Sequence, residues 1–140
     1  SMVLAMRFAG GHTSSGAPFF ELQDQWSSEG STEGLGGPNT LRGFKQSRFL
    51  GRVMTFNNVE LRCRFAQLDL FQQHFAMSAV PFFDLGSVSD EMSGAFSKDN
   101  YRNSTGLGLR IAWNVNTILR FDFAVSKEDQ QFFFNLGHAF

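Results

Sequence analysis

Apolar and polar side chains alternate along most of the chain, and this alternation predicts β-strands rather than helices. In "VLAMRF", for example, Leu4, Met6 and Phe8 fall on one side and Arg7 falls on the other. The same alternation recurs at 58–65, 74–86, 106–115, 119–126 and 131–140. We therefore expect about six strands of roughly 8–11 residues, the length that a tilted strand needs to cross a bilayer.

Long and short connections alternate between the predicted strands. A long Gly/Ser-rich loop, residues 10–51, follows the first strand, and a polar loop, residues 87–104, follows the third. Short turns are expected near "AQLDLFQQ", at "NVNT" and at "SKEDQQ". Long loops on one side of a membrane and short turns on the other are typical of outer-membrane β-barrels.

The polar faces of the predicted strands carry charges of both signs. They hold Arg62, Arg64, Arg110 and Arg120 together with Glu60, Asp84 and Asp122. In a membrane barrel such faces line the lumen while the apolar faces contact lipid; in a soluble sandwich the apolar faces pack on each other. A shift by one residue would put each arginine in lipid at about 2–4 kcal/mol. The pattern favours a membrane barrel, with a soluble all-β barrel or sandwich as the alternative.

Composition favours an all-β protein, although the mean hydropathy of -0.17 taken alone indicates a soluble one. The chain of 140 residues has 18 Phe beside 1 Tyr and 2 Trp, and 14 Gly. Its formal net charge of -1 offers no basic surplus for nucleic acid. No apolar run is long enough for a membrane helix. Cys63 is single, so no intramolecular disulfide forms, and "SM" at 1–2 is interpreted as a tag scar on an excised piece.

Three motifs in order resemble those of one family. The long loop contains "GGPNTLRGF", whose core is Leu41, Arg42, Gly43 and Phe44. A later stretch reads "FFDLG", and the tail reads "YRNSTGLGLR", "LRFDFAVS" and "FFFNLGHAF". Together they resemble the C-terminal barrel portion of the outer-membrane protein assembly and secretion superfamily, which includes BamA, TamA and surface antigens of that type.

The resemblance implies an all-β fold, namely about six C-terminal antiparallel strands of a larger transmembrane barrel, formed by residues 1–140. It implies a bacterial outer-membrane location and a role in inserting or transporting polypeptides there. The implied partners are membrane lipids, outer-membrane or secreted polypeptide substrates and the barrel-assembly machinery. Six strands are fewer than the roughly eight of the smallest spanning barrels. Closure would therefore need further strands or a homo-oligomer.

The resemblance also implies roles for particular residues. The long loop, 10–51, would fold back into the barrel, where Arg42 would meet Asp84, with Glu60 and Asp122 as further candidates on the inner wall. The alternative is that Arg42 is an ordinary solvent-exposed arginine of a surface loop, with no partner on the wall. The chain end would form the signal read by the insertion machinery: Phe134, Leu136, Gly137 and Phe140. Small inner-face residues would leave room for the loop: Gly86, Gly106, Gly108, Ala124 and Gly137.

No residue pattern points to an enzyme, a metal site or a cofactor. His12, His74 and His138 lack the spacing of metal ligands, and no Ser or Cys is paired with a His and a carboxylate. Gly106 and Gly108 lack the helix pattern that a phosphate-binding loop needs. Two other functions stay open: a barrel that anchors or exports an attached passenger domain, and a soluble β-domain that binds an apolar ligand.

Overall fold

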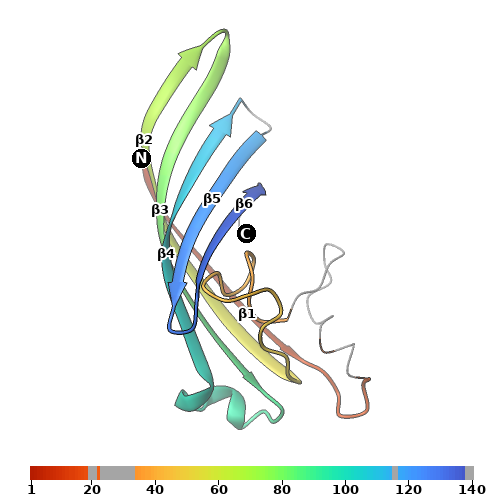
Figure 1. Ribbon diagram of the computed structural model, residues 1–140. Helices are drawn as coiled ribbons and strands as arrows, with labels where there is room; N and C mark the ends of the chain where they lie inside the picture. Colours follow the sequence, from red (N-terminus) through yellow and green to blue (C-terminus); the bar gives the residue numbers. More distant parts are fainter. Residues whose placement is uncertain (19–21, 23–33, 115–116, 138–140) are drawn as a thin grey trace.

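A single curved antiparallel sheet forms the body of the molecule (Figure 1). The computed structural model describes residues 1–18, 22, 34–114 and 117–137. Its strands follow chain order across the sheet. They are β1 (Met2–His12), β2 (Val53–Leu70), β3 (Gln73–Ser89), β4 (Tyr101–Trp113), β5 (Thr117–Ser126) and β6 (Gln130–Leu136). The prediction of an all-β antiparallel fold with about six strands is confirmed.

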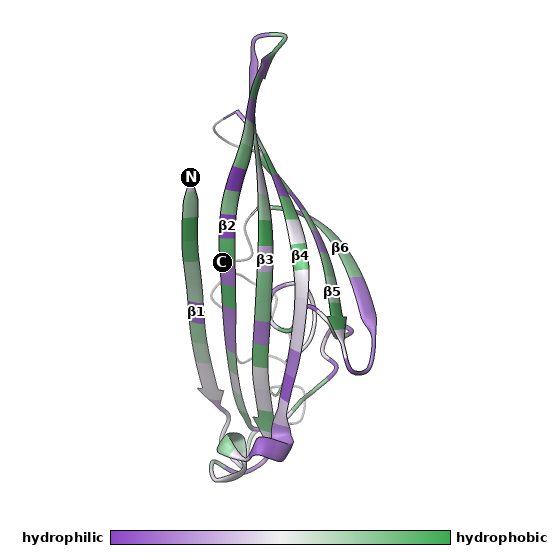
Figure 2. Cartoon of the chain, turned by 90° about the vertical axis from the view of Figure 1, so that its left-hand side faces the viewer, coloured by the Kyte–Doolittle hydropathy of each residue, from purple (hydrophilic) through white to green (hydrophobic). Residues whose placement is uncertain are grey.

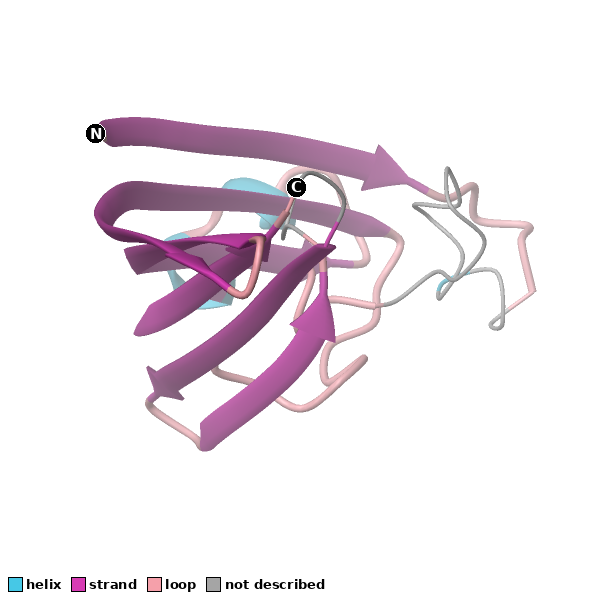
Figure 3. Cartoon of the chain, turned by 90° about the horizontal axis from the view of Figure 1, so that it is seen from above, coloured by secondary structure: helices cyan, strands magenta, loops and turns pink. Residues whose placement is uncertain are grey.

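The two edges of the sheet, β1 and β6, do not pair with each other in the described part of the chain. The described strands therefore form an open sheet, and the view from above in Figure 3 shows its curvature, which is consistent with part of a barrel. No described helix is long and apolar enough to span a membrane. Two short 3₁₀ turns, η3 (Gly94–Phe96) and η4 (Lys98–Asn100), lie between β3 and β4.

Outer-face side chains are apolar and exposed, as the alternation predicts. Along β6, Phe132, Phe134 and Leu136 are exposed while the residues between them are half-buried. The same holds for Leu4, Met6 and Phe8 of β1. Because strand side chains alternate between the two faces, the intervening residues point to the concave face. The part of the first loop from Gly34 onward lies against that concave face (Figure 1).

A β-bulge makes the second strand longer than expected. The β2–β3 register shifts between Arg64 and Ala66, so that Arg64 pairs with Ser78 and Ala66 with Met77. A bulge adds one residue to one strand and thereby reverses which residues face outward. The short turn predicted near "AQLDLFQQ" lies within that stretch at Phe71–Gln72, and the strand before it continues further than expected, to Leu70.

Other strand limits also differ from the prediction. β2, β3 and β4 have 18, 17 and 13 residues, which exceeds the expected length of roughly 8–11 residues. The polar connection after β3 is accordingly shorter, and spans 90–100. The final strand has 7 residues and ends at Leu136, because Gly137 takes a positive φ of 102° that breaks the extended backbone.

Candidate functional site

The part of the first loop that carries "GGPNTLRGF", residues 34–51, is called the motif loop here. A small apolar cluster packs it onto the inner face of β2. Leu35, Leu41 and Phe44 of the loop are buried together with Met54 and Phe56. The loop is closed on itself by an antiparallel bridge between Leu35 and Phe49. The first loop therefore has a defined shape on the inner wall, and this shape places the side chain of residue 42.

Arg42 is clamped by two carboxylates of the wall. Its Nε and Nη2 donate to Asp84 Oδ2 and Oδ1 at 2.7 and 2.6 Å, and its backbone N–H donates to Oδ2 at 3.2 Å. Its Nη1 donates to Glu60 Oε1 at 2.6 Å and lies 3.8 Å from Asp122 Oδ2. Bidentate charge-assisted bonds of this kind are among the strongest in proteins. The structure thus brings Arg42 together with all three predicted wall carboxylates.

Further arginines on the wall share these carboxylates. Asp122 accepts from Arg110 Nη1 at 2.6 Å and also from Arg120 Nε. Glu60 accepts from Arg62 Nε at 3.0 Å. Arg120 also reaches the loop, since its Nη2 donates to the carbonyl of Pro38 at 2.5 Å. Because buried charges are tolerated only when paired, the buried pairs of Arg42 with Asp84 and Glu60 hold the loop on the wall.

The guanidinium of Arg42 stays charged in this setting. Burial alone would lower the pKa of Arg42, but the hydrogen bonds to Asp84 and the charges of Asp84, Glu60 and Asp122 outweigh burial and raise it. An arginine whose pKa is raised does not lose its proton at any pH in which a cell lives. Docking of the loop is therefore independent of the titration of Arg42.

An aromatic ring forms the floor beneath Arg42. The guanidinium carbon lies 3.5 Å from the ring centroid of Phe82, which is buried on the inner face of β3. A Cβ on Gly106 would come within 2.4 Å of Phe82 Cζ. Gly106 therefore makes room for Phe82 and not for the loop.

The expectation that the small inner-face residues admit the loop is thus only partly correct. A Cβ on Gly86 would meet Leu35 and Leu41 of the loop at 2.8 Å, so this glycine does admit the loop. Gly108 instead leaves space for the side chains of Asp122 and Arg110. A Cβ on Gly137 would meet nothing within 4 Å.

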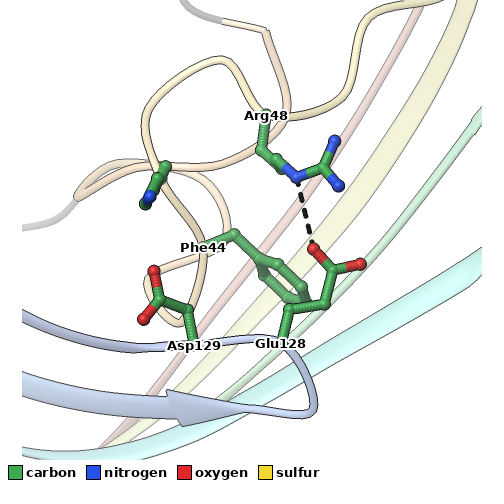
Figure 4. A pocket seen from close by; sticks show the side chains of 5 residues that line it. Phe44, Arg48, Glu128 and Asp129 are labelled. Carbon is green, nitrogen blue, oxygen red and sulfur yellow. Dashed lines mark ion pairs between the residues drawn. The ribbon is translucent and has the colours of Figure 1, made fainter.

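The rest of the motif reaches the hairpin between β5 and β6. A Cβ on Gly43 would lie 2.5 Å from Ser104 Cβ and 2.9 Å from Ser126 Cβ, so the loop backbone touches the wall there. Figure 4 shows Phe44 beside a small pocket that Lys45, Arg48, Glu128 and Asp129 also line. Arg48 Nε lies 3.2 Å from Glu128 Oε2, and both side chains are about half exposed.

Exchanging the charges of Arg48 and Glu128 tests this outer contact. Arg48→Glu alone is expected to weaken loop docking by less than about 1 kcal/mol, because exposed ion pairs contribute little. The double variant Arg48→Glu/Glu128→Arg should return protease resistance of the loop to the starting value. A single variant that releases the loop completely would show that this pair, and not the buried network, holds it.

The predicted signal residues of the C-terminus are only partly described. Phe134 and Leu136 point outward from β6, and Gly137 follows the strand. Phe140 lies outside the described residues, as does His138. The remaining histidines are apart, and the described residues contain no group of three or more His, Cys, Asp or Glu side chains placed to hold a metal ion.

Three residues of the site were not predicted. Asn58 donates to Asp84 Oδ1 at 2.8 Å and to the carbonyl of Thr40 at 2.7 Å, which ties the wall to the loop. Thr40 Oγ1 accepts from the backbone N–H of Gly36 at 2.9 Å. The third is Phe82. The alternation of side chains could have placed Phe82 and Asn58 on the inner wall. Phe82 is on the same strand face as Asp84, and Asn58 is on the same strand face as Glu60.

Comparison with known families decides the identity of this fold. The model of the Omp85 superfamily domain matches residues 1–140. The chain belongs to the Omp85 superfamily. Omp85 proteins are outer-membrane proteins of bacteria that act in the assembly and secretion of other polypeptides, without enzymatic activity. No curated protein and no solved structure matches the chain. The resemblance drawn from the three motifs is therefore confirmed.

Proposed function

We propose that this Omp85 chain forms the C-terminal part of an outer-membrane barrel that inserts or transports other polypeptides. The observation that carries the proposal is the clamp of Arg42 by Asp84 and Glu60, which fixes the motif loop on the inner wall. The exposed apolar outer face supports a position in lipid. The buried charge network supports a lumen that is filled by the loop.

The edge strand β6 is the proposed contact for substrate polypeptides. Within the described residues it pairs only with β5, so one side of its backbone is available. An unpaired edge can bind an extended segment through main-chain hydrogen bonds. Closing the lumen requires further strands, from the same polypeptide or from a second copy, and the mass of the detergent-solubilised chain distinguishes these two sources.

Photo-crosslinking in cells tests the substrate contact. A photoreactive phenylalanine analogue replaces Phe133 of β6, and a matched control replaces Leu107 on the outer face of β4. We expect adducts with several different outer-membrane or secreted polypeptides at Phe133 and none of them at Leu107. Adducts with one attached passenger domain alone would favour an exporter. Recovery of the chain from the soluble fraction would overturn the membrane proposal and favour a domain that binds an apolar ligand.

A further inference from the structure

The hairpin of β2 and β3 projects beyond its neighbours at the end of the sheet opposite the motif loop. β4 ends at Trp113, which is level with Phe75, and β1 begins at Met2, which is level with Cys63. β2 and β3 continue past both to their turn at Phe71–Gln72. Figure 2 shows this hairpin extending alone past the other strands.

The outer face of this hairpin is largely apolar, with Gln73 as a polar residue opposite Leu70. Leu68 pairs with Phe75, and Leu70 is exposed on the same face. The bulge at Arg64/Ala66 is what keeps them there, because without it the alternation would turn Leu68 and Leu70 inward. The opposite face carries polar groups, including the pair of His74 Nδ1 and Asp69 Oδ1 at 2.6 Å.

The other end of the same strands behaves differently. On the side of the motif loop the outer faces of β2 and β4 become more polar, with Thr55, Asn57 and Asn103, although Phe8 and Leu85, which pair with Asn57, are apolar. A strand end that leaves lipid for water is expected to make this change. The β2–β3 hairpin makes this change only at Gln73, which pairs with Leu70, so its outer face keeps Leu68, Leu70 and Phe75 up to the turn.

The tip of the hairpin presents an unusual aromatic residue. Phe71 has a φ of 51° and Gln72 a φ of 61°, a turn geometry that Asn-Gly normally occupies. A bulky residue at positive φ is uncommon and strained. The side chain of Phe71 is 87% exposed. The turn therefore holds a large apolar group at the outermost point of the hairpin.

An aromatic pair is the candidate marker of the level at which the hydrocarbon core of the membrane ends. Trp113 stacks on Phe75 with ring centroids 6.0 Å apart, and its Nε1 donates to Gln73 Oε1 at 3.0 Å. Tryptophans with an apolar body and a bonded N–H are typical of the membrane–water boundary. At ~3.3 Å per residue and the usual strand tilt, Leu70 and Phe71 lie about 5–8 Å beyond this level. The headgroup layer on each side of a bilayer is about 5–7 Å thick.

We propose that the outer face of the β2–β3 hairpin, Leu68, Leu70 and Phe71, lies in the headgroup layer of the membrane on the side opposite the motif loop. The inference rests on the membrane position proposed above. Its occupant is lipid because apolar side chains continue along the outer face of β2 from its lipid-facing part to Leu70, and because the reach of the hairpin matches the thickness of that layer. The hairpin thereby anchors the two strands that carry Glu60 and Asp84.

Tryptophan fluorescence in phosphatidylcholine vesicles with brominated acyl chains tests this inference. Phe71→Trp and Leu68→Trp are made in a chain whose own tryptophans are replaced, Trp26→Phe and Trp113→Phe. Gln67→Trp is the matched control, since Gln67 lies on the same hairpin with its side chain on the polar face. We expect shallow bromines to quench the reporters at positions 71 and 68 several-fold more than the reporter at position 67. Aqueous iodide should show the reverse order.

A depth standard separates the two proposals. A chain with Trp26→Phe keeps Trp113 as its only tryptophan, and bromine should quench it if the sheet is in the membrane. If bromine quenches Trp113 while iodide quenches the reporters at positions 68 and 71, the hairpin inference is overturned. The outer face of the hairpin would then contact water or a protein partner. Absence of quenching at Trp113 would overturn the membrane position itself.

Discussion

Replacing Arg42 with aspartate is expected to release the motif loop from the inner wall. The change removes the partner of Asp84 and Glu60, and it adds a fourth carboxylate beside those of Asp84, Glu60 and Asp122. Breaking a buried ion pair by removing one partner costs about 3–5 kcal/mol. Since cleavage of a folded protein follows the population of the open form, trypsin should cut after Arg48 about a hundredfold faster or more.

Lys45→Asp is the matched control for this experiment. It makes the same change of charge three residues further along the loop, at an exposed side chain. We expect the rate of cleavage after Arg48 to change little in this variant. Equal cleavage rates in the Arg42→Asp chain and the unaltered chain would mean that the buried network does not hold the loop.

Gly106→Ala is expected to be the most damaging single-methyl change in the sheet. The added Cβ would lie 2.1 Å from the carbonyl oxygen of Phe123 and 2.4 Å from Phe82 Cζ. The first atom belongs to the paired backbone of β5, so it cannot move without opening the β4–β5 ladder. Forcing extra volume into a packed site costs about 1–3 kcal/mol and occasionally more. The midpoint of urea unfolding in detergent should fall accordingly.

The loop offers a control for this glycine. At Gly16 an added Cβ would meet nothing within 4 Å, so Gly16→Ala should leave the midpoint unchanged. Displacement of Phe82 also removes the floor beneath Arg42, and faster cleavage of the loop in the Gly106→Ala chain is expected for that reason. A Gly106→Ala chain with normal stability and a resistant loop would contradict the packing described for Phe82.

Strand faces could be predicted from the sequence, whereas strand ends could not. Alternation identifies the outer face of β6 through Phe132 and Phe134, because side chains at every second position of a strand point to the same face of the sheet. It fails at Phe65 and Ala66, where the bulge adds a residue and reverses the phase. A period-two pattern cannot distinguish such a reversal from the end of a strand, and it therefore ends the strand too early.

The charged partners of Arg42 could be anticipated, but the packing around them could not. Glu60, Asp84 and Asp122 stand out because a charge on the inner face needs an opposite charge. The role of Gly106 depends on a ring from the neighbouring strand, Phe82, and thus on the register between β3 and β4. Likewise, the bond from Asn58 to the carbonyl of Thr40 depends on how the loop folds back. Pairwise register and loop shape are properties of the folded chain.

The wide sequence separation within the Arg42 network has a consequence for the order of folding. Arg42 and Asp84 are 42 residues apart, and Arg120 meets the carbonyl of Pro38 across 82 residues. Contacts between distant residues form late, because chain entropy must be lost before they can form. Asp84 and Asp122 come together only after β3, β4 and β5 have paired. The motif loop can therefore make all of these contacts only after β2 to β5 have paired, so its docking reports on the register of four strands at once.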